Sequence, residues 1–148
     1  MASAGRPLLL SRVVVVIVVV LCVTTVASSP EDPRTRLPTG YTSVARIRGH
    51  TIATTIAAVC YGVFDLYYFE IRYQNFPDNN YGNLLFELAL HAGVRIVHHR
   101  PEYIGVFSAR KEDGTRVVCK ISAFLLEFPF SYDHIDPSSG RIVDIVEL

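Results

Sequence analysis

Three of the five histidines are the side chains of this chain best suited by type to bind a metal ion. His98 and His99 are adjacent, and His91 lies a short way before them. Neutral imidazole is a good metal ligand, but neighbouring residues of a strand point to opposite faces, so His98 and His99 cannot share an ion there. No cysteine or acid stands at ligand spacing. We therefore expect neither a metal site nor a cofactor.

A second candidate for chemistry is the segment Asp133-His-Ile-Asp136, which could serve as an acid–base pair or a metal site. It stands beside Pro137-Ser-Ser-Gly140, a sequence typical of a turn. No serine nucleophile elbow or other hydrolase motif accompanies it. We interpret the segment as a polar loop, and we expect that the protein is not an enzyme.

The third candidate is the pair Cys60 and Cys119, whose spacing matches no metal motif. The remaining cysteine, Cys22, lies within the amino-terminal apolar segment. Two cysteines in an exported chain predict one disulfide, Cys60–Cys119. The alternative is a pair of buried free thiols, because free cysteine packs like a small hydrophobic residue.

The amino terminus has the pattern of a secretory signal peptide over residues 1–28. Arg6 and Arg12 give a positive start, and Val13 to Val23 is an apolar run too short to span a bilayer comfortably. Small residues follow, with cleavage expected after Ala27 or Ser28. We therefore predict a secreted protein, with an uncleaved signal anchor as the alternative.

The charge balance bears on the class of partner. The chain has 14 Lys and Arg against 14 Asp and Glu. Removal of the signal peptide takes away two arginines and no acids. A near-neutral chain lacks the basic stripe that neutralises phosphates, so we expect no nucleic-acid partner. Nor does it favour an anionic membrane surface.

Most of the chain downstream of residue 82 alternates apolar and polar residues with period two, which predicts β-strands. An Asp-Gly pair in Lys111–Gly114 is a strong hairpin signal between two of them. The last strand of that hairpin has one apolar face and one polar face. The apolar face is formed by Val117, Cys119, Ile121, Ala123 and Leu125, and the polar face by Arg116, Lys120 and Ser122. The predicted strands are 42–48, 83–92 (continuing or resuming over 94–98), 102–110, 115–126 and 141–146.

The segment Thr51 to Asn75 is predicted to be mainly helical. Its apolar residues follow helical spacing at Ile52, Ile56, Val59, Cys60 and Val63. A membrane-spanning helix is the alternative, since residues 51–69 are long enough. An intramembrane Asp65 would be costly, however, so a helix buried on a sheet is favoured.

One helix followed by an antiparallel meander predicts an α+β fold, with the helix packed on a four- to five-stranded sheet. The expected organisation is a signal peptide over 1–28, a Pro-rich linker over 29–40 and a single domain over 41–148. In this arrangement the inward face of strand 115–126 would present Cys119 to the helix that carries Cys60.

The order of elements over residues 40–130 resembles that of the cystatin family, chiefly the plant-type cystatins. An Asn-rich turn leads from the helix into Leu85-Phe-Glu-Leu88, and a hairpin, the strand Tyr103 to Ala109, a charged turn and a third strand follow. Pro129-Phe130 falls where the family has the proline and aromatic residue of its second hairpin. Gly40 stands in for the amino-terminal glycine.

In that family a first-hairpin Gln-x-Val-x-Gly loop enters the cleft of a cysteine protease. Here Ile96-Val-His-His-Arg100 occupies the slot, with Ile96 for the glutamine, Arg100 for the glycine and the valine displaced by one position. The resemblance implies a secreted protein that binds another protein. If it is an inhibitor, the resemblance implies that its partner is a papain-like cysteine protease and that it acts as a steric wedge in the cleft of that protease. The contact candidates are Gly40, Val97, His98, His99, Arg100, Pro129 and Phe130.

A different binding surface is suggested by aromatic residues near the end of the predicted helix. Exposed aromatic residues mark interfaces, although in a small domain such residues often belong to the core. In this alternative the protein is a secreted structural or partner-binding protein without inhibitory activity. The residues are Tyr67, Tyr68, Phe69, Tyr73, Phe76 and Tyr81.

Overall fold

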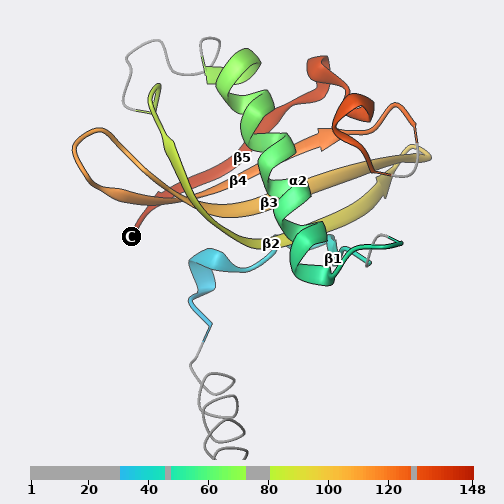
Figure 1. Ribbon diagram of the computed structural model, residues 1–148, viewed down its shortest axis with the longest axis horizontal. Helices are drawn as coiled ribbons and strands as arrows, with labels where there is room; N and C mark the ends of the chain where they lie inside the picture. The colour runs from blue at the N-terminus through green and yellow to red at the C-terminus, as the bar shows by residue number, and fades with distance from the viewer. Residues whose placement is uncertain (1–30, 46–47, 73–80, 128–129) are drawn as a thin grey trace, which may run out of the picture. The chain divides into compact units, whose positions relative to one another are not determined.

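The computed structural model describes residues 31–45, 48–72, 81–127 and 130–148. Asp32–Leu148 forms one compact unit. In it the helix α2 (Ile52–Leu66) lies across one face of a five-stranded antiparallel sheet of order β1-β2-β3-β4-β5 (Figure 1). The α+β prediction is confirmed. The strands are β1 Thr42–Ser43, β2 Leu85–Val97, β3 Arg100–Arg110, β4 Arg116–Phe124 and β5 Arg141–Glu147.

Several predictions fall outside the described residues. They are the signal peptide over 1–28 with its cleavage point, the aromatic residues Tyr73 and Phe76, and Pro129. Short 3-10 turns complete the described part of the chain: η1 (Pro33–Thr35), η3 (Tyr132–His134) and η4 (Pro137–Ser139).

The strands differ from their predicted bounds mainly at β1 and β2. β1 was expected over 42–48, but it pairs with β2 through Thr42 and Ser43 only. β2 continues through the predicted interruption near Gly93, and two irregularities in its pairing with β3 absorb the change of register. The β3–β4 hairpin is as predicted, because Gly114 adopts a φ of +88°, which suits a glycine in the turn.

The helix begins with a side-chain cap. Thr51 accepts a hydrogen bond on Oγ1 from the Thr54 N–H at 3.1 Å, which satisfies one of the free donors of the first turn. The buried face includes the predicted Val59, Cys60 and Val63, but Ile52 is 46% exposed because it lies at the first turn, near the rim of the sheet. Helical structure continues past Leu66 as a π-helical turn, η2 (Tyr67–Ile71).

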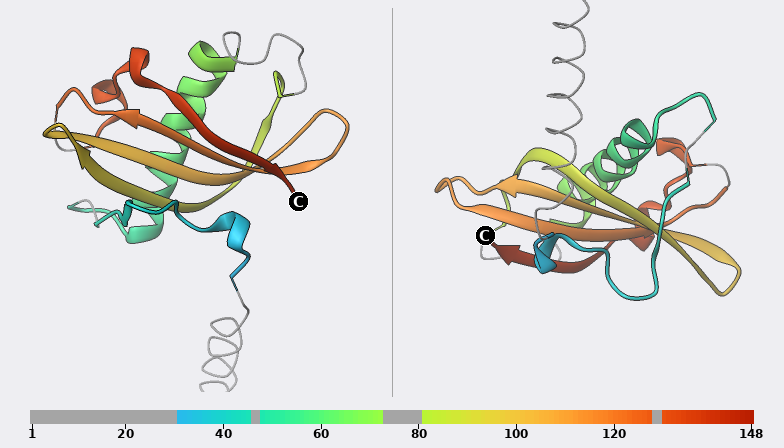
Figure 2. Two further views of the ribbon diagram at one scale, coloured as in Figure 1. Left: turned by 180° about the vertical axis from the view of Figure 1, so that it is seen from behind. Right: turned by 90° about the horizontal axis from the view of Figure 1, so that it is seen from below.

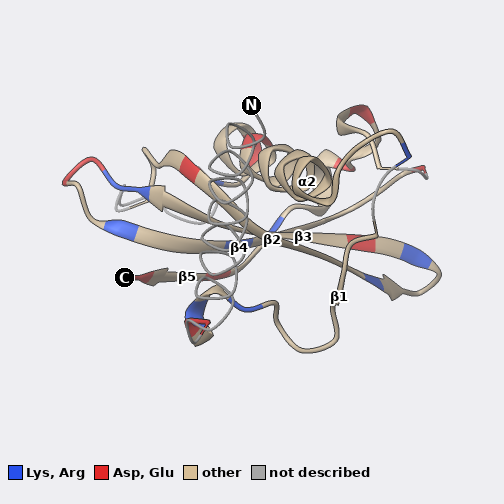
Figure 3. Cartoon of the chain, turned by 60° about the horizontal axis from the view of Figure 1, so that its bottom comes forward, with Lys and Arg blue, Asp and Glu red and all other residues tan. Residues whose placement is uncertain are grey.

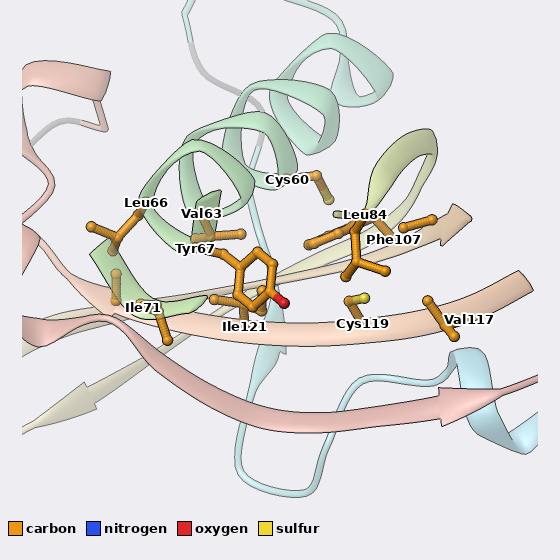
Figure 4. Packing of buried hydrophobic residues seen from close by; sticks show 12 residues of the cluster. Cys60, Val63, Leu66, Tyr67, Ile71, Leu84, Phe107, Val117, Cys119 and Ile121 are labelled. Atoms are coloured by element: carbon orange, nitrogen blue, oxygen red, sulfur yellow. The ribbon is translucent and has the colours of Figure 1, made fainter. Parts of the chain in front are cut away.

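The helix approaches the sheet closely at Gly105 in β3. A Cβ atom there would lie 2.7 Å from Val63 Cγ2 and 3.0 Å from Cys60 Cα. Neighbouring positions of the sheet carry the side chains that fill the rest of the interface (Figure 4), including Phe107, Val117, Cys119 and Ile121. Absence of a side chain at Gly105 therefore sets the distance between the two layers.

By length and composition, the helical stretch Ile52–Ile71 is apolar enough to cross a membrane, the one such helix in the described part of the chain. Core helices of proteins without a membrane segment meet the same test. In this structure one face of the stretch lies on the sheet, and 39% of its most apolar window is buried.

The segment that precedes β1, expected as a linker, contacts the sheet from Arg34 onward. Arg34 donates from Nη1 to the Glu147 carbonyl oxygen at 3.3 Å. A Cβ atom on Gly93 would lie 3.0 Å from Leu37 Cδ2 and 3.1 Å from Tyr41 Cβ. This segment thus packs against β2 and reaches the end of β5.

The predicted Cys60–Cys119 disulfide is absent, and both residues are buried free thiols. The Cys60 Sγ lies 3.3 Å from the His91 carbonyl oxygen and 3.5 Å from that of Val106, so it points at the main chain of β2 and β3. Cys119 lies on β4, opposite Phe107 of β3 (Figure 4). The structure therefore matches the alternative of two packed thiols, because the helix directs Cys60 toward a different pair of strands.

Substitution of Gly105 by alanine is expected to destabilise the fold by about 1–3 kcal/mol, because the added methyl group meets helix backbone that cannot move independently. Gly62→Ala is the matched control. Its Cβ would meet the flexible tip of Ile135 at 2.7 Å, and alanine gains about 1 kcal/mol of helix propensity over glycine. Urea unfolding measures the free energy of unfolding of both variants. An equal loss of stability in the two variants would contradict a close approach of the helix at Gly105.

Both thiols are expected to resist modification until the domain unfolds. Burial raises the pKa of Cys60 and of Cys119 to about 12, so almost no reactive thiolate exists at neutral pH. Alkylation in native buffer followed by peptide mapping should leave both residues unlabelled, whereas alkylation in denaturant without reductant should label both. Unlabelled cysteines in denaturant would instead demonstrate the disulfide.

Candidate functional site

The β2–β3 hairpin ends in a turn of two histidines. Val97 pairs with Arg100, which leaves only His98 and His99 in the loop. Their φ values are +48° and +64°. Two consecutive left-handed residues form the type I′ geometry that matches the twist of a hairpin, although side chains other than glycine seldom adopt it. The result is a narrow, exposed tip.

The β2–β3 turn, the chain before β1 and the chain directly after β4 lie at the same end of the sheet (Figure 2). β1 runs antiparallel to β2 with Thr42 opposite Val94, so Gly40 precedes β1 on the side of the hairpin tip. The segment after β4 also reaches this end, because the Leu125 N–H donates to the Pro101 carbonyl oxygen at 3.1 Å. We call this region, with the exposed side chains Ile96, His98, His99 and Leu126, the hairpin end.

Exposure of side chains at the hairpin end differs from what the sequence predicts. Phe130 was expected as a contact, but it is buried in the core, with its ring centroid 5.3 Å from that of Tyr103. The exposed apolar side chains are instead Ile96, 68% exposed, and Leu126, 62% exposed. Phe130 is buried because it belongs to one core cluster with Val59 of α2 and Tyr103 of β3.

Arg100 is held against the molecule. Its Nη2 lies 3.1 Å from Asp136 Oδ2, and its guanidinium lies 5.0 Å from the centroid of the Phe124 ring. Hydrogen bonds from Ser138 and from Arg100 lower the pKa of Asp136. The polar loop that contains Asp133 and Asp136 thus supports Arg100, and the Asp136 side chain also accepts from the Ser138 N–H at 3.1 Å at the start of η4.

Behind the hairpin end lies a carboxylate that the sequence analysis did not single out. Glu102 is 2% exposed and is the cross-strand partner of Arg95, with which it forms an ion pair. It also accepts from Ser122 Oγ at 2.9 Å and lies 3.3 Å from Arg141 Nη2. Four strands therefore meet at one side chain. A two-residue turn at His98-His99 would have predicted the Arg95–Glu102 pairing from sequence.

The same cluster holds the segment before β1. The Arg95 guanidinium lies 4.5 Å from the centroid of the Tyr41 ring, which is within cation–π range. The Tyr41 hydroxyl is enclosed, and burial together with the charge of Glu102 raises its pKa. Gly40, with a φ of +92°, turns the chain immediately before this anchor. Glu102, Arg95 and Tyr41 therefore position two of the three contact segments.

In the described part of the chain, no three His, Cys, Asp or Glu side chains group closely enough to hold an ion. Charges are dispersed over the strands rather than gathered into a basic stripe (Figure 3). The features of the hairpin end are shape, exposed apolar side chains and imidazole groups. This chemistry suits recognition of a protein surface.

The aromatic cluster proposed near the helix end does not form one exposed surface in the described residues. Tyr67 is buried in the core, where its hydroxyl donates to the Tyr81 carbonyl oxygen. Tyr68 is half-buried and stacks with Arg72, whose guanidinium lies 3.9 Å from the ring centroid. Phe69 is exposed. The π-helical turn directs these consecutive residues to different surroundings.

Comparison of the chain with models of known protein families finds no match, and searches of curated proteins and of solved structures find none either. The resemblance to cystatins therefore stays a prediction.

Replacement of Glu102 by glutamine is expected to destabilise the domain at neutral pH by about 1.5–3 kcal/mol, the range for hydrogen bonds to charged groups. Burial raises the pKa of Glu102, but hydrogen bonds from Arg95 and Ser122 outweigh it and lower the pKa below its usual value. The stabilisation is thus present above the unfolded-state pKa, about 4.3, and is lost as pH falls through the folded-state value.

The measurement is urea unfolding of the wild type and of Glu102→Gln between neutral and acid pH. The difference in unfolding free energy should narrow below about pH 4.3, because the glutamate of the unfolded chain then binds a proton while Glu102 of the folded protein is still charged. A difference that stays constant across the acid range would mean that the charge of Glu102 contributes nothing.

Proposed function

We propose that this chain is an exported protein-binding module that inserts the hairpin end into a cleft of its partner. The observation that carries the proposal is the convergence, at one end of the sheet, of a two-residue turn with two largely exposed apolar side chains, Ile96 and Leu126. The amino-terminal signal pattern supports export. The class of partner that we propose is a papain-like cysteine protease, as the cystatin resemblance implies.

The shape of the hairpin end supports insertion rather than flat docking. Only His98 and His99 lie beyond the last pair of the β2–β3 ladder. A narrow tip can enter a cleft that excludes wider loops. Ile96 stands one residue before the last pair, and Leu126 lies on the neighbouring segment, so each can bury apolar surface beside the inserted tip. Full burial of such a side chain contributes about 1.5–3 kcal/mol.

Rigidity of the hairpin end also supports the proposal. The ion pair of Arg95 with Glu102 lies two cross-strand pairs behind the turn, and Arg100 is fixed by Asp136. Ordering of loops and side chains on association costs free energy, and a surface that is already ordered avoids much of that cost. The cluster around Glu102 therefore prepares the tip for binding.

The test is a titration of papain activity with the secreted chain. We expect inhibition that saturates, and we expect Ile96→Ala to weaken it about tenfold, the effect of losing about 1.4 kcal/mol of apolar contact. Leu85→Ala is the matched control, since Leu85 is 67% exposed and lies at the opposite end of β2, opposite Arg110.

Three results would speak against the proposal. Papain that stays fully active at micromolar concentrations of the chain would remove this class of target. Inhibition that Leu85→Ala weakens as much as Ile96→Ala would place the contact away from the hairpin end. Mass spectrometry of the secreted protein tests export separately, since an amino terminus at Met1 would exclude cleavage of the signal.

A further inference from the structure

A cavity of about 230 Å³ opens beside the carboxyl-terminal half of α2. The turns η3 and η4 form its other wall. Its volume is below the roughly 300–1,000 Å³ typical of sites for whole small molecules, so it suits a single side chain. The lining residues are Gly62, Asp65, Leu66, Phe69, Glu70, Tyr132, Ile135 and Pro137.

Two carboxylates border the cavity without a balancing cation. Asp65 and Glu70 are both exposed, and neither forms an ion pair with a described residue. No Lys, Arg or His is among the residues that line the cavity. Glu87 on β2, by contrast, binds both Arg110 and Arg116. The cavity is therefore complementary in charge to a cation.

Two aromatic rings stand at the same cavity and remain accessible. Phe69 is 69% exposed and Tyr132 is 50% exposed. Asp65 and Tyr132 line the same cavity, and burial together with the charge of Asp65 raises the pKa of Tyr132. Aromatic faces attract cations by about 0.5–1 kcal/mol at exposed sites and by more when water is excluded.

The helix changes its winding where it meets the cavity. Phe69 and Glu70 both belong to the π-helical turn Tyr67–Ile71, whereas Asp65 belongs to the regular helix before it. Such turns are rare in proteins and are frequent at functional sites. Here the turn brings a ring and a second carboxylate to the cavity that Asp65 and Tyr132 already border.

We propose that this cavity binds the side chain of an arginine on a partner polypeptide. A guanidinium presents a planar face that stacks on aromatic rings and N–H donors that pair with carboxylates. Asp65 and Glu70 supply the acceptors, and Phe69 and Tyr132 supply the rings. The site lies on the helix side of the molecule and uses none of the residues of the hairpin end, so it does not depend on the function proposed above.

The experiment is a titration of the ¹⁵N-labelled chain with the peptide acetyl-Gly-Gly-Arg-Gly-Gly-amide, followed by NMR. The matched ligand is the same peptide with citrulline, which keeps the shape of arginine and removes its charge. We expect saturable shifts of amide signals confined to residues 62–72 and 131–137 for the arginine peptide. Citrulline should bind at least about tenfold more weakly, which corresponds to 1.4 kcal/mol.

Variants locate the site. The double substitution Asp65→Asn with Glu70→Gln should reduce affinity for the arginine peptide at least about tenfold, whereas Asp144→Asn, which removes an exposed carboxylate on β5, should not change it. An amide NMR spectrum with the same spread of chemical shifts as the wild type shows that each variant remains folded. Equal binding of the arginine and citrulline peptides, shifts outside the two segments, or unchanged affinity in the double variant would each overturn the proposal.

Discussion

The structure depends on one close approach between its two layers, the seating of α2 on Gly105. A helix buries its apolar face on a sheet only if the side chains between them fill the space without forcing the layers apart. At Gly105 the sheet contributes backbone alone, so the main chain of Cys60 and the side chain of Val63 lie directly on β3. The larger neighbouring side chains then fill the space around this point. The direction in which Cys60 points follows from the same contact.

A second constraint acts on the opposite face of the sheet, where Glu102 is almost fully buried. Burial of a carboxylate is unfavourable unless it is paired and hydrogen-bonded, and Arg95, Arg141 and Ser122 satisfy it. These partners come from β2, β5 and β4, so one charge fixes the relative positions of several strands. Because Arg95 also stacks on Tyr41, the same group orders the chain that leads into β1.

The two surfaces that we propose for recognition differ in chemistry. The hairpin end is apolar and narrow, and the cluster around Glu102 supports it from behind. The cavity beside α2 is acidic and aromatic, and the turns after β4 close it against the helix. Phe130 is buried, whereas Leu126 is exposed at the hairpin end and Tyr132 is exposed at the cavity. A partner that uses one surface leaves the other accessible for separate testing.

Local patterns in the sequence were sufficient to predict the order of the helix and the strands, although not the bounds of β1 and β2. Alternation fixes which face of a strand is apolar, helical spacing identifies Val59, Cys60 and Val63, and Asp-Gly specifies the β3–β4 turn, because each signal depends on residues close in the chain. Exposure at the hairpin end was harder to predict. Pro129-Phe130 looked like a contact by position, yet Phe130 packs with Tyr103, a residue distant in sequence.

By itself, then, the sequence determined the α+β class, the helix, the meander and the apolar face of β4. Only the tertiary structure decided that Cys60 and Cys119 are separate thiols, that Glu102 is the shared partner of two arginines, and that Asp65 and Glu70 meet Tyr132 at one cavity. The reason is physical. Secondary structure follows from local backbone and side-chain preferences, whereas burial, pairing and cavities depend on which distant segments the packed layers bring together.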